Sequence, residues 1–305
     1  MQLRTSCMLV LGTLLTMATQ AQKRKKNTPI SLTTTGMACC IEEAEALPNS
    51  ANTDALFAAT ATTAAFGKLH QEPLPFTLAA PKGAMQMFNC ADGVPGMAYT
   101  IPAADASMNF LIVIQEWWGL NDHIKQEAER FYEALGGKVH VLAVDLYDGK
   151  VAASVDSAQK LIGAALQSKR KEAILMGAMD YAGKGANIYT VGWCFGGMMS
   201  LQTAIMGGSR VRGAVMYYGT PEKNTAQIAK IQCPVLGIFG TQDRSIPNET
   251  VDQFAAAMQA AGKTFILHRY EAGHAFANPS NPGYNRQFGD DAFDKAVAFL
   301  KERMR

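Results

Sequence analysis

The sequence has few charged residues and almost no excess of either sign. Of its 305 residues, 18% are charged, and 28 Lys and Arg against 26 Asp and Glu leave a formal net charge of +2. This balance predicts no strongly basic or acidic face, so nothing electrostatic favours nucleic acid or an anionic membrane surface as a partner. Partners must therefore be inferred from individual sites.

Internal repeats, metal-binding motifs and phosphate loops are also missing. No Cys/His cluster has convincing metal-ligand spacing. The glycines and lysine of segment 183–185 lack the spacing of a phosphate loop, and this segment is expected to be a turn that leads into a strand. We therefore expect a protein that needs neither a metal nor another cofactor.

The first 21 residues have the layout of a signal peptide. An apolar run over residues 7–18 is too short to cross a bilayer comfortably, and a basic cluster follows at 23–26. Ala21 is a small residue suited to the last position before a cleavage site. We predict cleavage there, a periplasmic or secreted location, and no stable membrane insertion afterwards. The alternative is an uncleaved amphipathic N-terminus.

Residues 22–82 are rich in Thr and Ala and have few apolar residues at any sustained period. This composition predicts an irregular N-terminal extension and not a domain. Phe57, Phe66 and the segment 74–76 are candidates for holding it against the main body. Composition alone leaves open whether the extension serves attachment or self-association.

Two adjacent cysteines, Cys39 and Cys40, lie in this extension. An oxidising compartment favours disulfides, so we expect at least one of them to pair, with Cys90 or Cys233 as candidate partners. The alternative is that they remain free or pack as small apolar residues.

From residue 83 onward, buried apolar runs alternate with amphipathic stretches of helical length. This alternation is typical of an α/β fold with a mostly parallel sheet flanked by helices, here as one domain over residues 83–305. The two stretches 85–90 and 96–101 indicate an antiparallel hairpin at the sheet edge. The other expected strands are 110–115, 139–144, 188–192, 213–218, 235–239 and 264–269. The expected helices include 122–135, 157–179, 251–261 and 290–304.

The sharpest motif is Gly192-Trp193-Cys194-Phe195-Gly196-Gly197, between an expected strand and a helical stretch. A G-x-C-x-G pattern at a strand-to-helix turn predicts a nucleophile elbow, whose strained backbone needs flanking glycines. The Phe195 N–H would face an oxyanion, and the helix N-terminus would favour a thiolate at Cys194. The alternative is a buried core cysteine beside a glycine-rich turn.

Two later motifs favour the catalytic interpretation. Asp243 follows the apolar run 235–239 and a glycine turn, and His274 follows the strand-like run 265–270 in the same way. The order nucleophile, acid, histidine is that of an α/β-hydrolase. His274 would deprotonate the thiol and later protonate the leaving oxygen, while Asp243 would orient the ring. His268 lies within the strand pattern and is interpreted as structural.

Over residues 83–305 the chain resembles the dienelactone hydrolase family, in which a cysteine occupies the elbow of an α/β-hydrolase fold. The family places a glutamate at the end of an early strand, beside the nucleophile, and Glu116 matches it within Ile112-Val113-Ile114-Gln115-Glu116-Trp117-Trp118-Gly119. The resemblance implies an oxyanion hole formed by the N–H groups of Trp117 and Phe195. Without it, Glu116 would be an acidic residue at a strand end.

The family segment Asp-Leu-Tyr is also present, as Asp145-Leu146-Tyr147-Asp148-Gly149-Lys150. In that family, an arginine two places after the tyrosine binds the substrate carboxylate, so the resemblance implies one here. This chain instead has Gly149 at that place and Lys150 one place further on. Asn278 replaces a second arginine, four places after the histidine. A lysine does not substitute well for a bidentate arginine. The resemblance therefore supports the assignment of the catalytic residues better than it supports the family's substrate.

We therefore predict a hydrolase that cleaves a small carboxylic ester or lactone through a Cys194-His274-Asp243 triad and a thioester acyl-enzyme. The alternative is a non-catalytic binding protein that retains the hydrolase pocket. Because the charged anchors are missing, neutral substrates are expected to be preferred. The substrate-binding wall is expected to include Trp118, Tyr147, Lys150 and Phe276.

Overall fold

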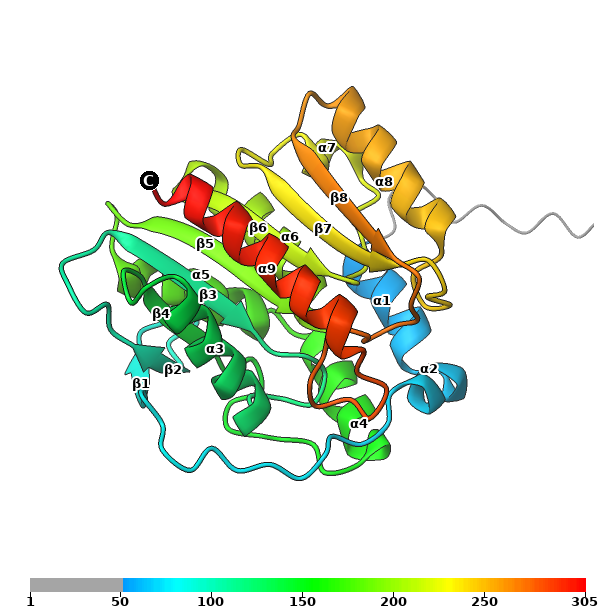
Figure 1. The fold of residues 1–305 in the computed structure, drawn as a ribbon, viewed down its shortest axis with the longest axis horizontal. Helices are drawn as coiled ribbons and strands as arrows, with labels where there is room; N and C mark the ends of the chain where they lie inside the picture. Colours follow the sequence, from blue (N-terminus) through cyan, green and yellow to red (C-terminus); the bar gives the residue numbers. More distant parts are fainter. Residues whose placement is uncertain (1–51) are drawn as a thin grey trace, which may run out of the picture. The chain divides into compact units, whose positions relative to one another are not determined.

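The computed structural model describes residues 52–305 (Figure 1). The expected signal peptide, with its cleavage, and the Cys39-Cys40 pair lie outside these residues and stay predictions. Within the described part, Cys90, Cys194 and Cys233 form no disulfide with one another.

The core of the fold is an eight-stranded sheet in the order β1-β2-β4-β3-β5-β6-β7-β8, which is parallel from β4 to β8. The expected hairpin is present, because β1 and β2 pair antiparallel at the sheet edge and β2 pairs antiparallel with β4. Every strand expected from the sequence forms, and no strand end differs from the expected one by more than two residues. The strands are β1 Ala84–Phe88, β2 Gly96–Ile101, β3 Asn109–Ile114, β4 His140–Val144, β5 Asn187–Trp193, β6 Val211–Tyr217, β7 Val235–Gly240 and β8 Phe265–Tyr270.

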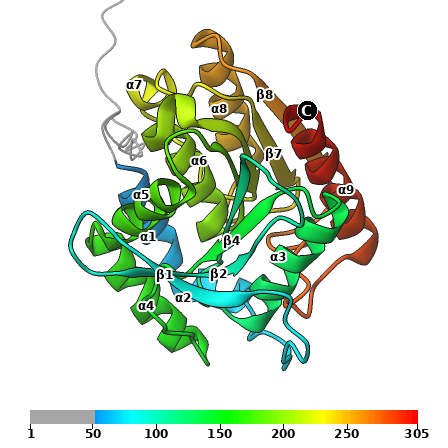
Figure 2. The same cartoon turned by 90° about the vertical axis from the view of Figure 1, so that its left-hand side faces the viewer.

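Helices cover both faces of this sheet, with α3 and α9 on one face and α5, α6 and α8 on the other (Figure 1; Figure 2). Residues 111–114 of the central strand β3 are apolar and fully buried on both faces of the sheet. A parallel strand of this kind must be covered by helices on both sides. The helices are α3 Asp122–Ala134, α4 Val155–Gln167, α5 Arg170–Ala182, α6 Phe195–Gly207, α7 Thr225–Ile228, α8 Asn248–Ala260 and α9 Arg286–Arg303, with a short 3₁₀ turn at Gly208–Arg210. In the described residues, no helix combines the length and apolar character that crossing a membrane requires.

The expected helix over 157–179 is wrong, because two helices, α4 and α5, occupy this region. The break falls at Ser168, whose backbone is extended (φ −117°, ψ 162°) and whose Oγ accepts a hydrogen bond from the Arg170 N–H at 3.3 Å. Serine competes for backbone hydrogen bonds in this way and favours helix ends.

The expectation of irregular structure is wrong for residues 53–69 of the extension, where two helices form, α1 Thr53–Ala61 and α2 Ala64–Leu69, whereas residues 70–82 contain neither helix nor strand. The side chains of Asn52 and Thr63 cap their N-termini. Phe57 and Phe66 are buried, as expected of residues that hold this segment to the body. Leu74 and Phe76 remain largely exposed, although the Leu74 N–H donates to the Ser280 carbonyl at 3.0 Å.

Buried polar contacts fix α1 to the hydrolase body. The Thr53 hydroxyl donates to the Glu222 carboxylate at 2.5 Å, and Asp54 pairs with the Lys171 ammonium at 2.9 Å. Lys171 is buried and also pairs with Glu172 at 3.2 Å, so Asp54 completes a buried charge cluster that links α1 to α5. The segment 53–69 is therefore an integral part of the folded domain.

Candidate active site

Cys194 lies at the strand-to-helix turn between β5 and α6, with φ 54° and ψ −114°. A non-glycine residue rarely adopts positive φ, and such strain is typical of functional positions. Only glycine fits at the two flanking positions. A Cβ at Gly192 would lie 2.2 Å from the Gly196 carbonyl oxygen, and a Cβ at Gly196 would lie 2.3 Å from the Ile114 carbonyl oxygen. The second contact seats the start of α6 on the end of β3, next to Glu116.

The Cys194 thiol is buried, with 1% of the residue exposed. Burial raises its pKa well above the ordinary value, and the nearby Glu116 carboxylate raises it further, while a hydrogen bond from the Phe195 N–H opposes both. The resting sulfur is therefore protonated, and a base is needed to produce the thiolate.

His274 and Asp243 form a hydrogen-bonded pair on neighbouring loops, after β8 and β7. Nδ1 of His274 donates to Asp243 Oδ2 at 2.6 Å, and the backbone N–H groups of Ser245 and Ile246 hold Asp243 Oδ1 at 2.7 and 3.0 Å. In the neutral ring, this contact selects the tautomer with the proton on Nδ1 and the lone pair on Nε2. Nε2 is buried and has no hydrogen-bond partner among residues 52–305.

Glu116 lies at the end of β3 and is buried beside the thiol. Its Oε2 accepts a hydrogen bond from Asn278 Nδ2, while Oε1 has no partner in the described part of the chain. Burial raises the pKa of this carboxyl to about 8, so it is largely protonated at neutral pH.

Aromatic rings surround these groups. Trp117 is fully buried and contacts Trp118, with ring centroids 5.1 Å apart, and Tyr147 lies 6.1 Å from the Phe195 ring. The expected wall residue Phe276 is buried behind Tyr218, 5.7 Å away, and the Tyr218 ring in turn lies 5.0 Å from His274. Lys150, the remaining expected wall residue, is exposed at the surface.

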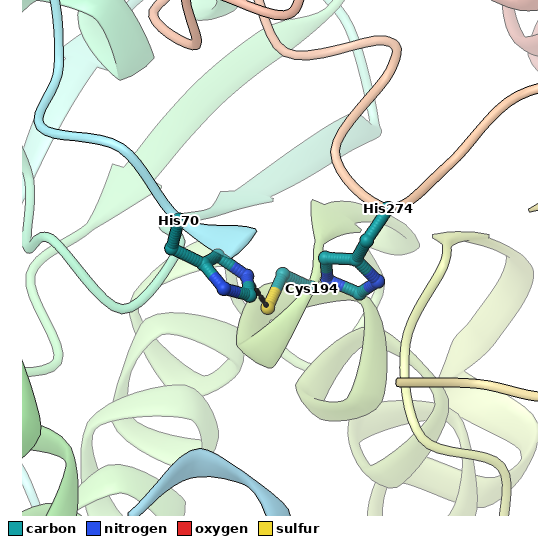
Figure 3. A group of neighbouring side chains, drawn as sticks. All are labelled: His70, Cys194 and His274. Carbon is teal, nitrogen blue, oxygen red and sulfur yellow. Dashed lines mark hydrogen bonds between the residues drawn. The ribbon is translucent and has the colours of Figure 1, made fainter. Parts of the chain in front are cut away.

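One site residue, His70, was not expected from the sequence. It follows α2, stacks on Phe66 with ring centroids 3.9 Å apart, and lies with Nε2 3.7 Å from the Cys194 sulfur (Figure 3). Its Nδ1 is 2.8 Å from the Phe66 carbonyl oxygen. Its pKa is lowered to about 3, chiefly by burial and then by His274, so the ring is neutral.

The segment 53–70 covers the thiol with aromatic rings. Phe57 packs on Phe195 at 5.9 Å, and Phe66 lies edge-on to Trp117 at 5.1 Å. No sequence spacing relates His70 to the other candidate site residues. The only sequence signals for the cover formed by segment 53–70 were the helix caps Asn52 and Thr63, each of which precedes a buried phenylalanine.

The sheet order and the elbow define an α/β-hydrolase. A profile of the dienelactone hydrolase family matches residues 96–304, and the chain belongs to this family. A protein of Methylorubrum extorquens, provisionally named a carboxymethylenebutenolidase, is 30% identical over 231 residues, which cover 69% of this chain and 78% of that protein. The protein described here is therefore a dienelactone hydrolase-like hydrolase.

Solved structures show the same fold. A crystal structure provisionally identified as a dienelactone hydrolase from Klebsiella pneumoniae has a TM-score of 0.62 at 23% identity and covers 71% of this chain and 98% of that one. A dienelactone hydrolase-like promiscuous phosphotriesterase from metagenomic libraries has a TM-score of 0.63 at 20% identity, over 72% and 98% of the two chains.

Proposed function

We propose that the protein hydrolyses small, neutral carboxylic esters or lactones with Cys194 as the nucleophile, His274 as the general base and Asp243 as the orienting acid. The observation that carries the proposal is the His274 ring, which Asp243 holds through Nδ1, while Nε2 is buried without a partner among residues 52–305 and one ring nitrogen lies within 4.8 Å of the Cys194 sulfur. Nucleophilic catalysis requires a base that a third group orients close to the nucleophile, and this arrangement supports such a role.

In the first half of the reaction, His274 takes the thiol proton and the sulfur attacks the carbonyl carbon. An S–C bond forms and the carbonyl electron pair moves to oxygen, where the N–H groups of Trp117 and Phe195 would stabilise it. The C–O bond then breaks, and His274 returns its proton to the leaving oxygen. Water attacks the thioester with His274 again as base, which releases the acid and restores the thiol.

The neutral substrate class follows from the surroundings of the thiol. Buried aromatic rings line it, and Lys150 is exposed at the surface. Asn278, at the position of the family's second arginine, donates to Glu116. A substrate carboxylate would lose its hydration in this centre without a bidentate cation in return.

The test is a panel of esters and lactones assayed with purified protein, with and without an alkylating agent, alongside Cys194→Ala. We expect alkylation to stop turnover and the variant to retain its melting temperature while losing activity by at least about 10³-fold. Turnover by Cys194→Ala at the wild-type rate would contradict the mechanism. A folded wild-type protein that binds esters and hydrolyses none would instead support a binding protein.

A further inference from the structure

A sulfur and two imidazole rings meet at the carboxyl ends of the parallel strands. One ligand atom from each of His70, Cys194 and His274 lies within 4.8 Å of the other two, and Figure 3 shows both rings next to the sulfur. The three residues come from separate parts of the fold: the end of α2, the elbow, and the loop after β8. In sequence they have no metal-ligand spacing, so only the fold reveals the cluster.

The separations suit a transition-metal ion. An ion held about 2.3 Å from sulfur and about 2.0–2.1 Å from nitrogen in tetrahedral geometry keeps its ligand atoms roughly 3.4–3.6 Å apart. The Cys194 sulfur and His70 Nε2 are already 3.7 Å apart. The widest pair, at no more than 4.8 Å, would close by roughly 1 Å, which small rotations of the rings can provide.

Both histidines also have the supporting contacts that metal ligands usually have. A histidine that binds a metal through Nε2 normally donates its Nδ1–H to a carboxylate or backbone carbonyl, which fixes the tautomer and the ring orientation. Nδ1 of His274 donates to Asp243, and Nδ1 of His70 contacts the Phe66 carbonyl. The His274 Nε2 is buried and has no partner among residues 52–305.

We propose that His70, Cys194 and His274 bind a zinc-class transition-metal ion, with Nε2, Sγ and Nε2 as ligands. Cys194 loses its proton to solvent on binding and donates a sulfur electron pair, so no oxidation or reduction is involved. The thiolate and the Asp243 carboxylate together balance two positive charges in the buried centre. Three protein ligands leave a fourth position for water or another small ligand.

Metal binding and thiol catalysis exclude each other, although they use the same centre. The ion would occupy both the sulfur and the nitrogen that the hydrolytic reaction needs, so the metal-bound protein is blocked as a cysteine hydrolase. This inference goes beyond the proposed function and does not depend on hydrolysis, because binding is measured on the ion itself.

The test is a titration of the reduced, chelator-treated full chain with Co²⁺ alone, followed by displacement with Zn²⁺. We expect a thiolate-to-cobalt charge-transfer band, a stoichiometry of one ion per chain, and loss of the band when Zn²⁺ is added. Cys194→Ser should lose the band. His70→Gln should raise the Zn²⁺ Kd by at least about tenfold. The control is His268→Gln, a change on β8 outside the cluster, which should leave the Kd unchanged.

Melting temperatures of all variants separate ligand loss from misfolding, and Cys194→Ser keeps the test decisive if His70→Gln unfolds. A folded wild-type protein without the band, or a Cys194→Ser variant that keeps it, would overturn the proposal. An unchanged Kd in folded His70→Gln would remove His70 from the ligand set and overturn it equally. A band in a protein that hydrolyses no ester would overturn only the proposed function, and hydrolysis without a band only the metal site.

Discussion

Asn278 donates a hydrogen bond from Nδ2 to the Glu116 carboxylate and thereby links the loop after β8 to the end of β3. Both side chains are buried, with 6% and 4% of the residues exposed. The resemblance to dienelactone hydrolases implies an arginine at position 278 for the substrate carboxylate. In this chain the position instead holds a carboxyl group of the protein itself.

The buried Glu116 should make the protein less stable as the pH rises. Burial raises its folded-state pKa from an ordinary value of 4.5 to about 8, so between these values the unfolded chain has lost a proton that the folded chain retains. The unfolding free energy then falls with pH, by at most about 1.4 kcal/mol per pH unit from this group. Urea unfolding from pH 5 to 8 should show a smaller decline for Glu116→Gln than for wild type. Glu302→Gln, an exposed change on α9, should match wild type.

Glu116 should also control the reactivity of the Cys194 thiol. Once ionised, above about pH 8, its charge raises the thiol pKa, and Glu116→Gln removes that charge. We expect the alkylation rates of wild type and variant to coincide below about pH 7, with the variant faster at pH 9. The measurement is iodoacetamide labelling of Cys194 on chelator-treated protein, followed by peptide mapping. Identical profiles up to pH 9 would show that Glu116 does not act on the thiol.

The two proposed partners of Cys194 should differ in their effect on turnover. His274→Ala removes the proposed base and should lower kcat on the order of 10⁴-fold or more, whereas Asp243→Asn keeps this base but loses its orientation and should cost less. Both rates are measured on the best ester of the panel. An Asp243→Asn variant slower than His274→Ala would contradict these roles.

The elbow should not tolerate a methyl group at Gly196. A Cβ there would lie 2.3 Å from the Ile114 oxygen and 2.5 Å from the Gln115 oxygen, and backbone atoms cannot move aside cheaply. Gly196→Ala should therefore lower the unfolding free energy by several kcal/mol, on the scale of severe core substitutions. The matched control is Gly163→Ala in α4, where a Cβ meets open space and should stabilise the helix by up to about 1 kcal/mol. Equal melting temperatures for the two variants would refute the steric explanation.

A neutral lactone should have a higher kcat/KM than its carboxylate-bearing analogue. The comparison uses a matched pair of substrates at several salt concentrations. If the kcat/KM of the anionic substrate were higher by about tenfold or more, which is the effect of one charge-assisted hydrogen bond, another cation of the protein would have to bind the substrate carboxylate. Lys150→Ala would then identify that cation if the preference disappears.

The sequence predicted those parts of the site that depend on local geometry. Cys194 could be found because a strand-to-helix turn needs glycines at fixed offsets, and Asp243 and His274 because each follows a buried strand directly. Neighbouring parallel strands end at the same sheet edge, so the topology alone brings their loops together.

The remaining site residues depend on packing that has no local pattern. His70 and Cys194 are 124 positions apart and meet only because α1 and α2 dock on the body. Asn278 could be recognised as a departure from the family, but its bond to Glu116 depends on how one loop folds across the sheet end. The helices α1 and α2 were missed because the stretch 53–69 is rich in alanine and threonine and its two buried phenylalanines show no sustained period.

The cover formed by α1 and α2 adds a population term to the affinity of every substrate that must reach the sulfur. Phe57, Phe66 and His70 lie over the thiol, so such a substrate requires the cover to move aside by local unfolding. The apparent Kd of the substrate then equals its intrinsic Kd divided by the fraction of open molecules. A substitution in α1, far from any bond that is made or broken, would thus shift the apparent affinities of all such substrates by one common factor, but not in the same way that of an ion bound by His70, which needs the cover in place.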